Sequence, residues 1–388
     1  MLCAAAVSAP MLVAFRVLQG LGGGMLMPVG MAFLYRLAHP ERRGTVMGAF
    51  GVPMLLGPAL GPVLSGWFLD FADWRWIFLI NVPIGAVALF YGIRALPSLP
   101  AQGAVGRIDI PGLILGPLAF ASLSYGIGEG TNGWGSAANI TGIVVGLVAL
   151  ALFVGRELTA SEPLIELRVF RSPDFSRAIV AQWSVIAGLF GTMFLVPLFL
   201  QQVGGYGAFE TGLFTLPSAL TAACFMPVGG RLFDRFGIRL PAIVGLTSII
   251  AAMWLLSRVT ADTSGWDLIL PLMLQGGGMG FLMMPLGTQV LNSAPRNIIT
   301  RVTSLTGALQ NLVTSFAIAC FATLLQLRGG SRLAEQGVPS GADAGAIVQA
   351  AAFGDVFFAA AAVLCLAFGM VWTLCRQNQA APPIPSAA

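Results

Sequence analysis

Residues 268–291 read LILPLMLQGGGMGFLMMPLGTQVL, an apolar stretch without a charged side chain. A bilayer core requires about 20 mostly apolar residues per helix, because backbone amides and carbonyls find no water there. We therefore expect this stretch to be a transmembrane helix. Ten further windows meet the same test: 12–34, 46–69, 76–93, 111–128, 138–155, 178–200, 211–230, 240–257, 302–325 and 352–375. The sequence thus predicts an all-α, polytopic membrane protein with about eleven complete spans.

The composition excludes the other broad classes of protein. Of the 388 residues, 57% are apolar and only 9% are charged, whereas soluble domains carry about 25% charged residues. Disordered chains combine low hydrophobicity with high charge, and the mean hydropathy here is +0.85. The 20 basic residues are all arginines, scattered between apolar runs. This pattern predicts a lipid bilayer as partner and no nucleic acid.

Residues that would support metal or catalytic chemistry are scarce. No pair of cysteines has C-x-x-C spacing, and the single histidine, His39, lies in a predicted loop. Neither the G-x-S-x-G nor the H-E-x-x-H motif occurs. We therefore expect no enzyme activity, no metal and no cofactor, and we interpret the five cysteines as small apolar side chains.

The arginines also predict the orientation of the chain. Fifteen loop and tail arginines fall on one side of the predicted membrane and four on the other. Positively charged loops are retained in the cytoplasm, so the side with fifteen should be cytoplasmic. This side includes the C-terminal tail.

An internal repeat links two of the spans. Residues 19–28 read QGLGGGMLMP and residues 275–285 read QGGGMGFLMMP, with their glutamines 256 positions apart. Many transporters consist of parallel repeats with the substrate path between them. The offset indicates either eight-helix halves or six-helix halves separated by two extra helices. Three spans precede the second copy, so we expect the first half to be incomplete by about three helices, with residues 1–8 as a stub.

Four motifs then occur in order along the chain. They are RVLQG at 16–20, GPALGP at 57–62, WRWIFLINVPIG at 74–85 and GRLFDRFGIR at 230–239. The set resembles the fourth-span, antiporter, marker and cytoplasmic-loop motifs of the fourteen-span drug:proton antiporters of the major facilitator superfamily.

The resemblance implies a major facilitator fold, with 111–128 and 138–155 as two inserted helices. The expected organisation is a remnant of the N-terminal half at 1–96, a linker with the inserted helices at 97–160, the C-terminal half at 161–376 and a cytoplasmic tail at 377–388. It also implies proton-coupled export of hydrophobic or amphipathic small molecules across a bacterial inner membrane by alternating access. Two alternatives remain: export of a dedicated metabolite, and an inactive remnant or subunit that lacks the first three helices.

Arg16 is the sole basic residue inside a predicted span. Such a charge is costly in a bilayer, so it should face the bundle interior and have a partner. The resemblance assigns proton coupling to Arg16 together with Gln19. The alternative is an arginine that extends to the interface from near the helix start.

Two further motifs suggest moving parts. Small residues and prolines in the second window allow close helix packing and bending, which suits a moving interface or packing alone; they are the glycines Gly57, Gly61 and Gly66 and the prolines Pro53, Pro58 and Pro62. In the loop motif, glycines permit a tight turn while Asp234 can pair with an arginine or a helix terminus. We expect a gating latch there, with an ordinary positive loop as the alternative; its residues are Gly230, Asp234, Arg235, Gly237 and Arg239.

Other polar side chains fall within spans. We expect these side chains either to line a substrate cavity or to form hydrogen bonds between helices. These residues are Gln182, Trp183, Gln289, Gln310 and Asn311.

Overall fold

The computed structural model describes residues 1–95, 109–130, 134–160, 167–295, 298–336 and 342–377. Within these ranges all regular secondary structure is helical. The predicted domain boundaries at 97 and 161 and the tail at 377–388 lie at or outside the edges of the described residues, so they stay predictions.

Each of the eleven predicted windows coincides with helix. The helices are α1 (Ala9–Leu37), α2 (Arg43–Phe71), α3 (Trp76–Leu79), α4 (Asn81–Ala95), α5 (Ile110–Glu129), α6 (Ala137–Thr159), α7 (Pro173–Gln202), α8 (Ala208–Phe236), α9 (Arg239–Leu256), α10 (Ile269–Asn292), α11 (Ile299–Gln336) and α12 (Ala342–Gln377). Short 3-10 turns stand between them: η1 (Leu2–Ala5), η2 (Pro40–Arg42), η4 (Leu167–Arg171) and η5 (Gly265–Leu268).

The described residues contain nine segments long and apolar enough to cross a membrane, from Trp76–Arg94 to Gly345–Trp372. Some side chains of α1 and α2 lie outside the described set, so the spans at 12–34 and 46–69 are not tested by this count.

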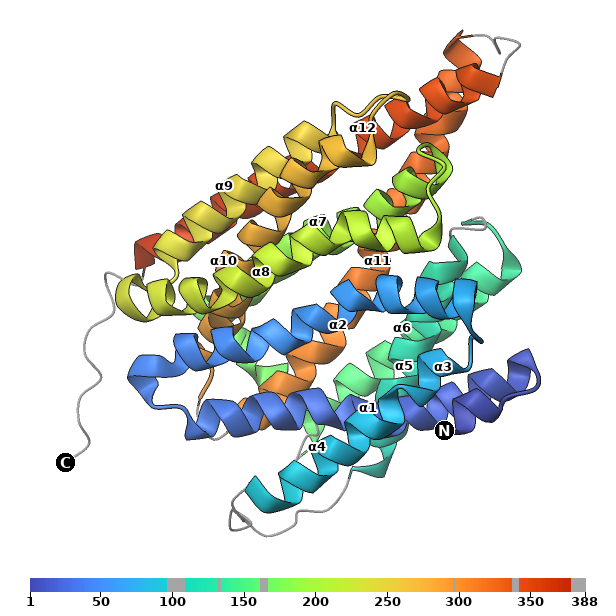
Figure 1. Ribbon diagram of the computed structural model, residues 1–388. Coiled ribbons are helices and arrows are strands. Elements are labelled where there is room, and N and C mark those ends of the chain that lie inside the picture. The colour runs from blue at the N-terminus through green and yellow to red at the C-terminus, as the bar shows by residue number, and fades with distance from the viewer. Residues whose placement is uncertain (96–108, 131–133, 161–166, 296–297, 337–341, 378–388) are drawn as a thin grey trace, which may run out of the picture.

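The helices form two groups that meet along α2 and α8. In Figure 1, α7, α8, α9 and α12 lie above α1–α6, α11 crosses from the upper group to the lower one, and α2 runs beside α8, its most extensive partner. We call the end of the bundle where α8 ends and α2 begins the basic end, because Arg42, Arg235 and Arg239 lie there. The opposite end is where α7 ends and α12 begins.

The core is centred on α10. In its apolar window 67% of residues are buried, whereas Phe78 is the one buried residue in the segment Trp76–Arg94. The glycine run makes this central position possible: a Cβ on Gly276 would collide with the carbonyl oxygen of Ser218 in α8. A Cβ on Gly278 would lie 2.6 Å from the carbonyl oxygen of Gly245 in α9. The absence of side chains therefore lets α8 and α9 close on α10 from two sides.

The first copy of the repeat is packed differently. Gly20, Gly22 and Gly24 occupy the positions in α1 that correspond to Gly276, Gly278 and Gly280, yet a Cβ on any of these three would meet nothing within 4 Å. The two copies thus share a sequence pattern, but among the described residues only the second is enclosed by neighbouring helices.

The helix pair α5 and α6 forms a tight hairpin. A Cβ on Gly142 would lie 2.7 Å from the Cα of Gly126, and Asn139 Nδ2 donates to the carbonyl oxygen of Gly126 at 2.7 Å. At the tip, Trp134 Nε1 donates to Thr323 Oγ1 of α11 at 2.7 Å, which ties the hairpin to the C-terminal group.

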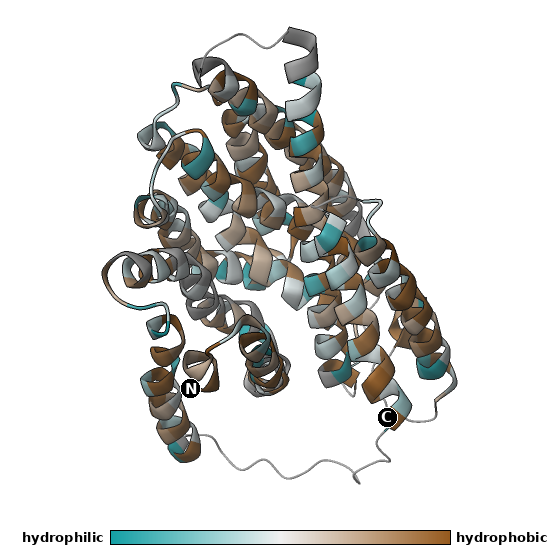
Figure 2. Cartoon of the chain, turned by 90° about the vertical axis from the view of Figure 1, so that its right-hand side faces the viewer, coloured by the Kyte–Doolittle hydropathy of each residue, from teal (hydrophilic) through white to brown (hydrophobic). Residues whose placement is uncertain are grey.

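The outer faces of the helices are strongly apolar. Figure 2 shows hydrophobic residues along most of the long helices. Large side chains are exposed on α4 and α6, among them Leu89, Ile93, Val148 and Leu152. Apolar residues that are exposed in this density require a lipid environment.

Candidate functional site

The loop motif places Asp234 against the N-terminus of α2. Asp234 Oδ2 accepts hydrogen bonds from the backbone N–H of Thr45 at 2.8 Å and from Thr45 Oγ1 at 2.6 Å. The first amides of a helix have no partner within the helix, and this end carries a partial positive charge. A carboxylate is therefore bound well there, and the contact joins the last turn of α8 to the first turn of α2.

The local sequence explains how Asp234 reaches this position. Gly237 ends α8 with a φ of 68°, and its N–H donates to the carbonyl oxygen of Phe233. This left-handed conformation favours glycine, so the motif stops the helix one turn after Asp234. Gly230, one turn before it, is buried within α8.

Two of the three arginines of the motif contact aromatic rings. The guanidinium of Arg235 lies 5.9 Å from the ring centroid of Phe236, and that of Arg239 lies 5.4 Å from the ring of Trp372 in α12. Of the pairings open to Asp234, the structure shows the one with the helix terminus at Thr45. Arg239 bridges α9 to α12.

Of the three glycines of α2 expected to allow close packing, Gly66 lies where α2 and α8 approach each other closely. A Cβ on Gly66 would lie 3.0 Å from the backbone N of Phe209, and one on Gly212 would lie 2.9 Å from the backbone N of Val63. Gly57 and Gly61 have nothing within 4 Å of a Cβ, which corrects the expectation of tight packing there. The side chains of Pro58 and Pro62 lie outside the described set, although α2 is helical through both residues.

Arg16 and Gln19 form a hydrogen-bonded pair on α1. Arg16 Nη1 donates to Gln19 Oε1 at 3.2 Å, and its guanidinium lies 4.7 Å from the ring centroid of Phe78. Cys3 Sγ donates to the same Gln19 oxygen at 3.5 Å. The structure thus brings the RVLQG motif to Phe78 of the WRWIFLINVPIG motif.

The structure corrects the expectation that Arg16 faces the bundle interior, because its side chain is exposed. Residues of η1 and α3 pack beside this part of α1 in a small cluster that contains Cys3, Ala4 and Phe78. The counterpart of Gln19 in the repeat behaves differently. Gln275 is 1% exposed, and its Nε2 donates to the buried Thr192 Oγ1 of α7 at 3.0 Å.

The five polar residues proposed as cavity lining are distributed over α7, α10 and α11. Gln182 Nε2 would lie 3.7 Å from a Cβ on Gly287, so α7 and α10 meet there. The neighbouring Trp183 has a buried indole N–H without a hydrogen-bond partner, and its ring packs beside Phe170. Gln289 and Gln310 are half-buried, and Asn311 is exposed.

The sequence interpretation missed Thr45, Thr192 and Gln202. Thr45 was detectable in principle, since it lies in the first turn of a helix, where anions bind. Thr192 and Gln202 become significant only through partners far along the chain. Among the described residues, no three histidine, cysteine, aspartate or glutamate side chains lie together as a metal site.

Comparison with known proteins extends these observations. Residues 1–318 match the family model described as Major Facilitator Superfamily. The chain is 33% identical over 316 residues to the lincomycin resistance protein LmrB of Listeria innocua, covering 81% of this chain and 67% of that protein. It is 35% identical over 331 residues to the multidrug resistance protein B homolog of Mycobacterium tuberculosis, covering 84% and 61%.

A further relative is the uncharacterized MFS-type transporter YhcA of Bacillus subtilis, which is 33% identical over 310 residues. The match covers 80% of this chain and 58% of YhcA, so the chain spans about three-fifths of the length of such relatives. The family match extends over most of the chain and includes all the N-terminal motifs. The chain therefore belongs to the Major Facilitator Superfamily, a family of multi-pass membrane transporters and not of enzymes.

Proposed function

We propose that this protein serves proton-coupled export of hydrophobic or amphipathic small molecules from a bacterial cell by alternating access. The observation that carries the proposal is the contact between Asp234 and Thr45, since it fastens the two helix groups at one end of the bundle. In alternating access, one group moves against the other and opens the two ends in turn. The hydrogen-bonded contact at the basic end must open in one of these two states, so it is suited to hold the other.

Further observations support the proposal. α2 and α8 approach each other closely at Gly66 and Gly212, at the end opposite Asp234. Because α2 and α8 are in contact at both of their ends, this helix pair is a candidate for a hinge or a gate. The names of two relatives refer to lincomycin resistance and multidrug resistance, which supports a drug-like compound as the cargo.

The proposed orientation places the basic end and the C-terminal tail in the cytoplasm. It rests on the excess of arginines at that end. The Asp234 contact then closes the cytoplasmic side and holds the outward-open state. Proton coupling is assigned to Arg16 with Gln19, the hydrogen-bonded pair of α1.

The test is Asp234→Asn, which keeps the shape of the side chain and removes its charge. Hydrogen bonds to charged groups contribute about 1.5–3 kcal/mol, so the state closed at the basic end should lose roughly tenfold or more in population. We expect slower uncoupler-sensitive efflux of a fluorescent amphipathic dye from a host without its own pumps. Thr45→Val should show the same defect, because it removes one of the two donors.

Asp262→Asn is the matched control, because Asp262 is exposed in the loop between α9 and η5 at the opposite end. It should export at the rate of the unmodified protein. Equal export by Asp234→Asn and Asp262→Asn, at equal protein level in the membrane, would contradict the latch.

A further inference from the structure

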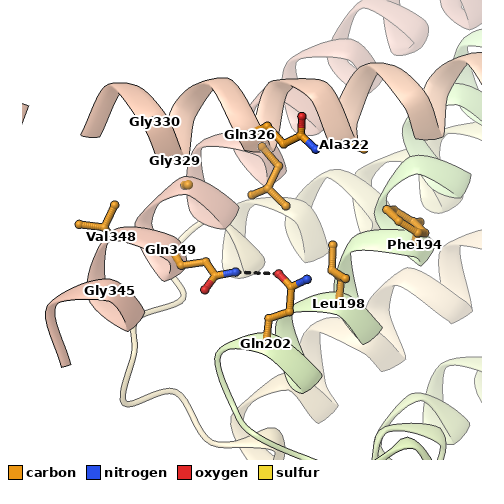
Figure 3. Close-up of a pocket in the computed structure, with 12 residues that line it drawn as sticks. Phe194, Leu198, Gln202, Ala322, Gln326, Gly329, Gly330, Gly345, Val348 and Gln349 are labelled. Atoms are coloured by element: carbon orange, nitrogen blue, oxygen red, sulfur yellow. Dashed lines mark hydrogen bonds between the residues drawn. The ribbon is translucent and has the colours of Figure 1, made fainter. Parts of the chain in front are cut away.

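A pocket lies between α7, α11 and α12 at the end opposite the basic end (Figure 3). Its volume is about 680 Å³. Pockets that hold drug-sized molecules measure about 300–1,000 Å³, so this one is large enough for such a ligand. None of the residues discussed for the latch or for Arg16 lines it.

The polar groups of the pocket are amides. Gln202 of α7, Gln326 of α11 and Gln349 of α12 line it, and Gln349 Nε2 donates to Gln202 Oε1 at 2.7 Å. The other lining side chains, such as Phe194, Leu198 and Val348, are apolar, and among the residues that the structure describes no charged side chain lines the pocket. Figure 3 shows the Gln202–Gln349 hydrogen bond bridging two of the three helices.

Three glycines provide much of the space. Gly329, Gly330 and Gly345 line the pocket within helices, and a Cβ on any of them would meet nothing within 4 Å. No neighbouring backbone therefore requires glycine at these positions. Glycine in a helix lowers helix stability by about 1 kcal/mol relative to alanine. These three glycines therefore destabilise their helices without allowing another helix to approach closely. Because they have no side chains, these glycines leave the wall of the pocket open.

We propose that this pocket binds an uncharged amphipathic molecule that carries amide or hydroxyl groups. An ionised ligand would lose hydration without a compensating charge, whereas glutamine amides both donate and accept hydrogen bonds. The apolar wall would cover the remainder of the ligand. With the orientation proposed above, the pocket is a release site on the outer side of the membrane. This role rests on the proposed function, whereas the binding itself does not.

The test is photolabelling of the protein in lipid nanodiscs with an aryl azide analogue of chloramphenicol, an uncharged compound with an aromatic ring, an amide and hydroxyl groups. Adducts are located by peptide mass spectrometry. We expect labelled peptides that contain residues 322–330 and 345–352. Gly345→Leu, which projects a side chain into the pocket, should reduce this labelling at least tenfold.

Gly369→Leu is the matched control, since Gly369 also lies in α12 with open space around its Cβ but does not line the pocket. It should label like the unmodified protein. Gln349→Leu keeps the volume and removes an amide, so half-saturation should require roughly three- to tenfold more probe. Labelling that is absent from both peptides, or equal in Gly345→Leu and Gly369→Leu, would overturn the proposal.

The experiment needs no proton gradient, so it separates this inference from the proposed function. Loss of energised export with retained labelling at these peptides contradicts the export proposal alone. Retained export with no labelling contradicts the pocket alone.

Discussion

Single side chains in this protein have roles that their neighbours in space define. Asp234 and Asp262 are both aspartates near the ends of helices. Asp234 accepts a hydrogen bond at the N-terminus of α2, whereas Asp262 is exposed in a loop. Gln19 and Gln275 are repeat counterparts. The first accepts a hydrogen bond from an arginine on the surface, and the second fastens α10 to α7 in the core. The same residue type thus serves an exposed polar pair in one half and helix packing in the other.

Arg16 provides a prediction at this scale. Arg16→Ala should abolish uncoupler-sensitive dye efflux while the protein still inserts into the membrane, because the proposed coupling charge is lost. Arg16→Lys should restore export only in part, since an ammonium replaces a planar guanidinium over the Phe78 ring. Efflux rates and membrane protein levels are measured in the same host, and full export by Arg16→Ala would remove the residue from the mechanism.

At the scale of elements, glycine decides which helices lie at the centre. α10 is enclosed because Gly276 and Gly280 face α8 while Gly278 faces α9. α2 and α8 meet through Gly66 and Gly212. Without a large hydrophobic driving force between helices in lipid, such close backbone contacts are a main source of association.

A pair of substitutions at corresponding repeat positions tests this role of glycine. Gly276→Leu should lower the thermal unfolding midpoint and the yield of monodisperse protein, because overpacking costs about 1–3 kcal/mol or more. Gly20→Leu should leave both unchanged, since its Cβ meets open space. The unfolding midpoint and the yield of each variant are measured by size-exclusion chromatography of the heated, detergent-solubilised protein. Equal losses in the two variants would show that α1 is as tightly enclosed as α10.

At the scale of the whole molecule, the basic end and the apolar belt define how the protein lies in a membrane. Arginines gather where α8 ends and α2 begins, and large apolar side chains cover the outer faces of the helices. The proposed latch is at the basic end and the proposed ligand pocket at the other. The two proposals therefore assign different functions to the two sides of the membrane.

The orientation gives the prediction at this scale. In a cysteine-free background, His39→Cys should react with an impermeant maleimide only after the cells are permeabilised, because the basic end should face the cytoplasm. Asp262→Cys, at the other end, should react in intact cells. Both positions are exposed, so accessibility alone does not distinguish them. The reverse labelling pattern would invert the proposed topology.

Composition, apolar windows and motifs are enough to predict the helical membrane fold, the position of every long helix and the family. Bilayer thickness and backbone hydrogen bonding fix helix length and apolarity locally, so a window of residues carries that information. The packing of the helices in space was needed to show that Asp234 binds the N-terminus of α2, that Arg16 is exposed and that Gln202 meets Gln349. These contacts join residues far apart in the chain. They depend on how helices are rotated and paired, which the apolar pattern leaves open because lipid-facing and protein-facing sides are both apolar.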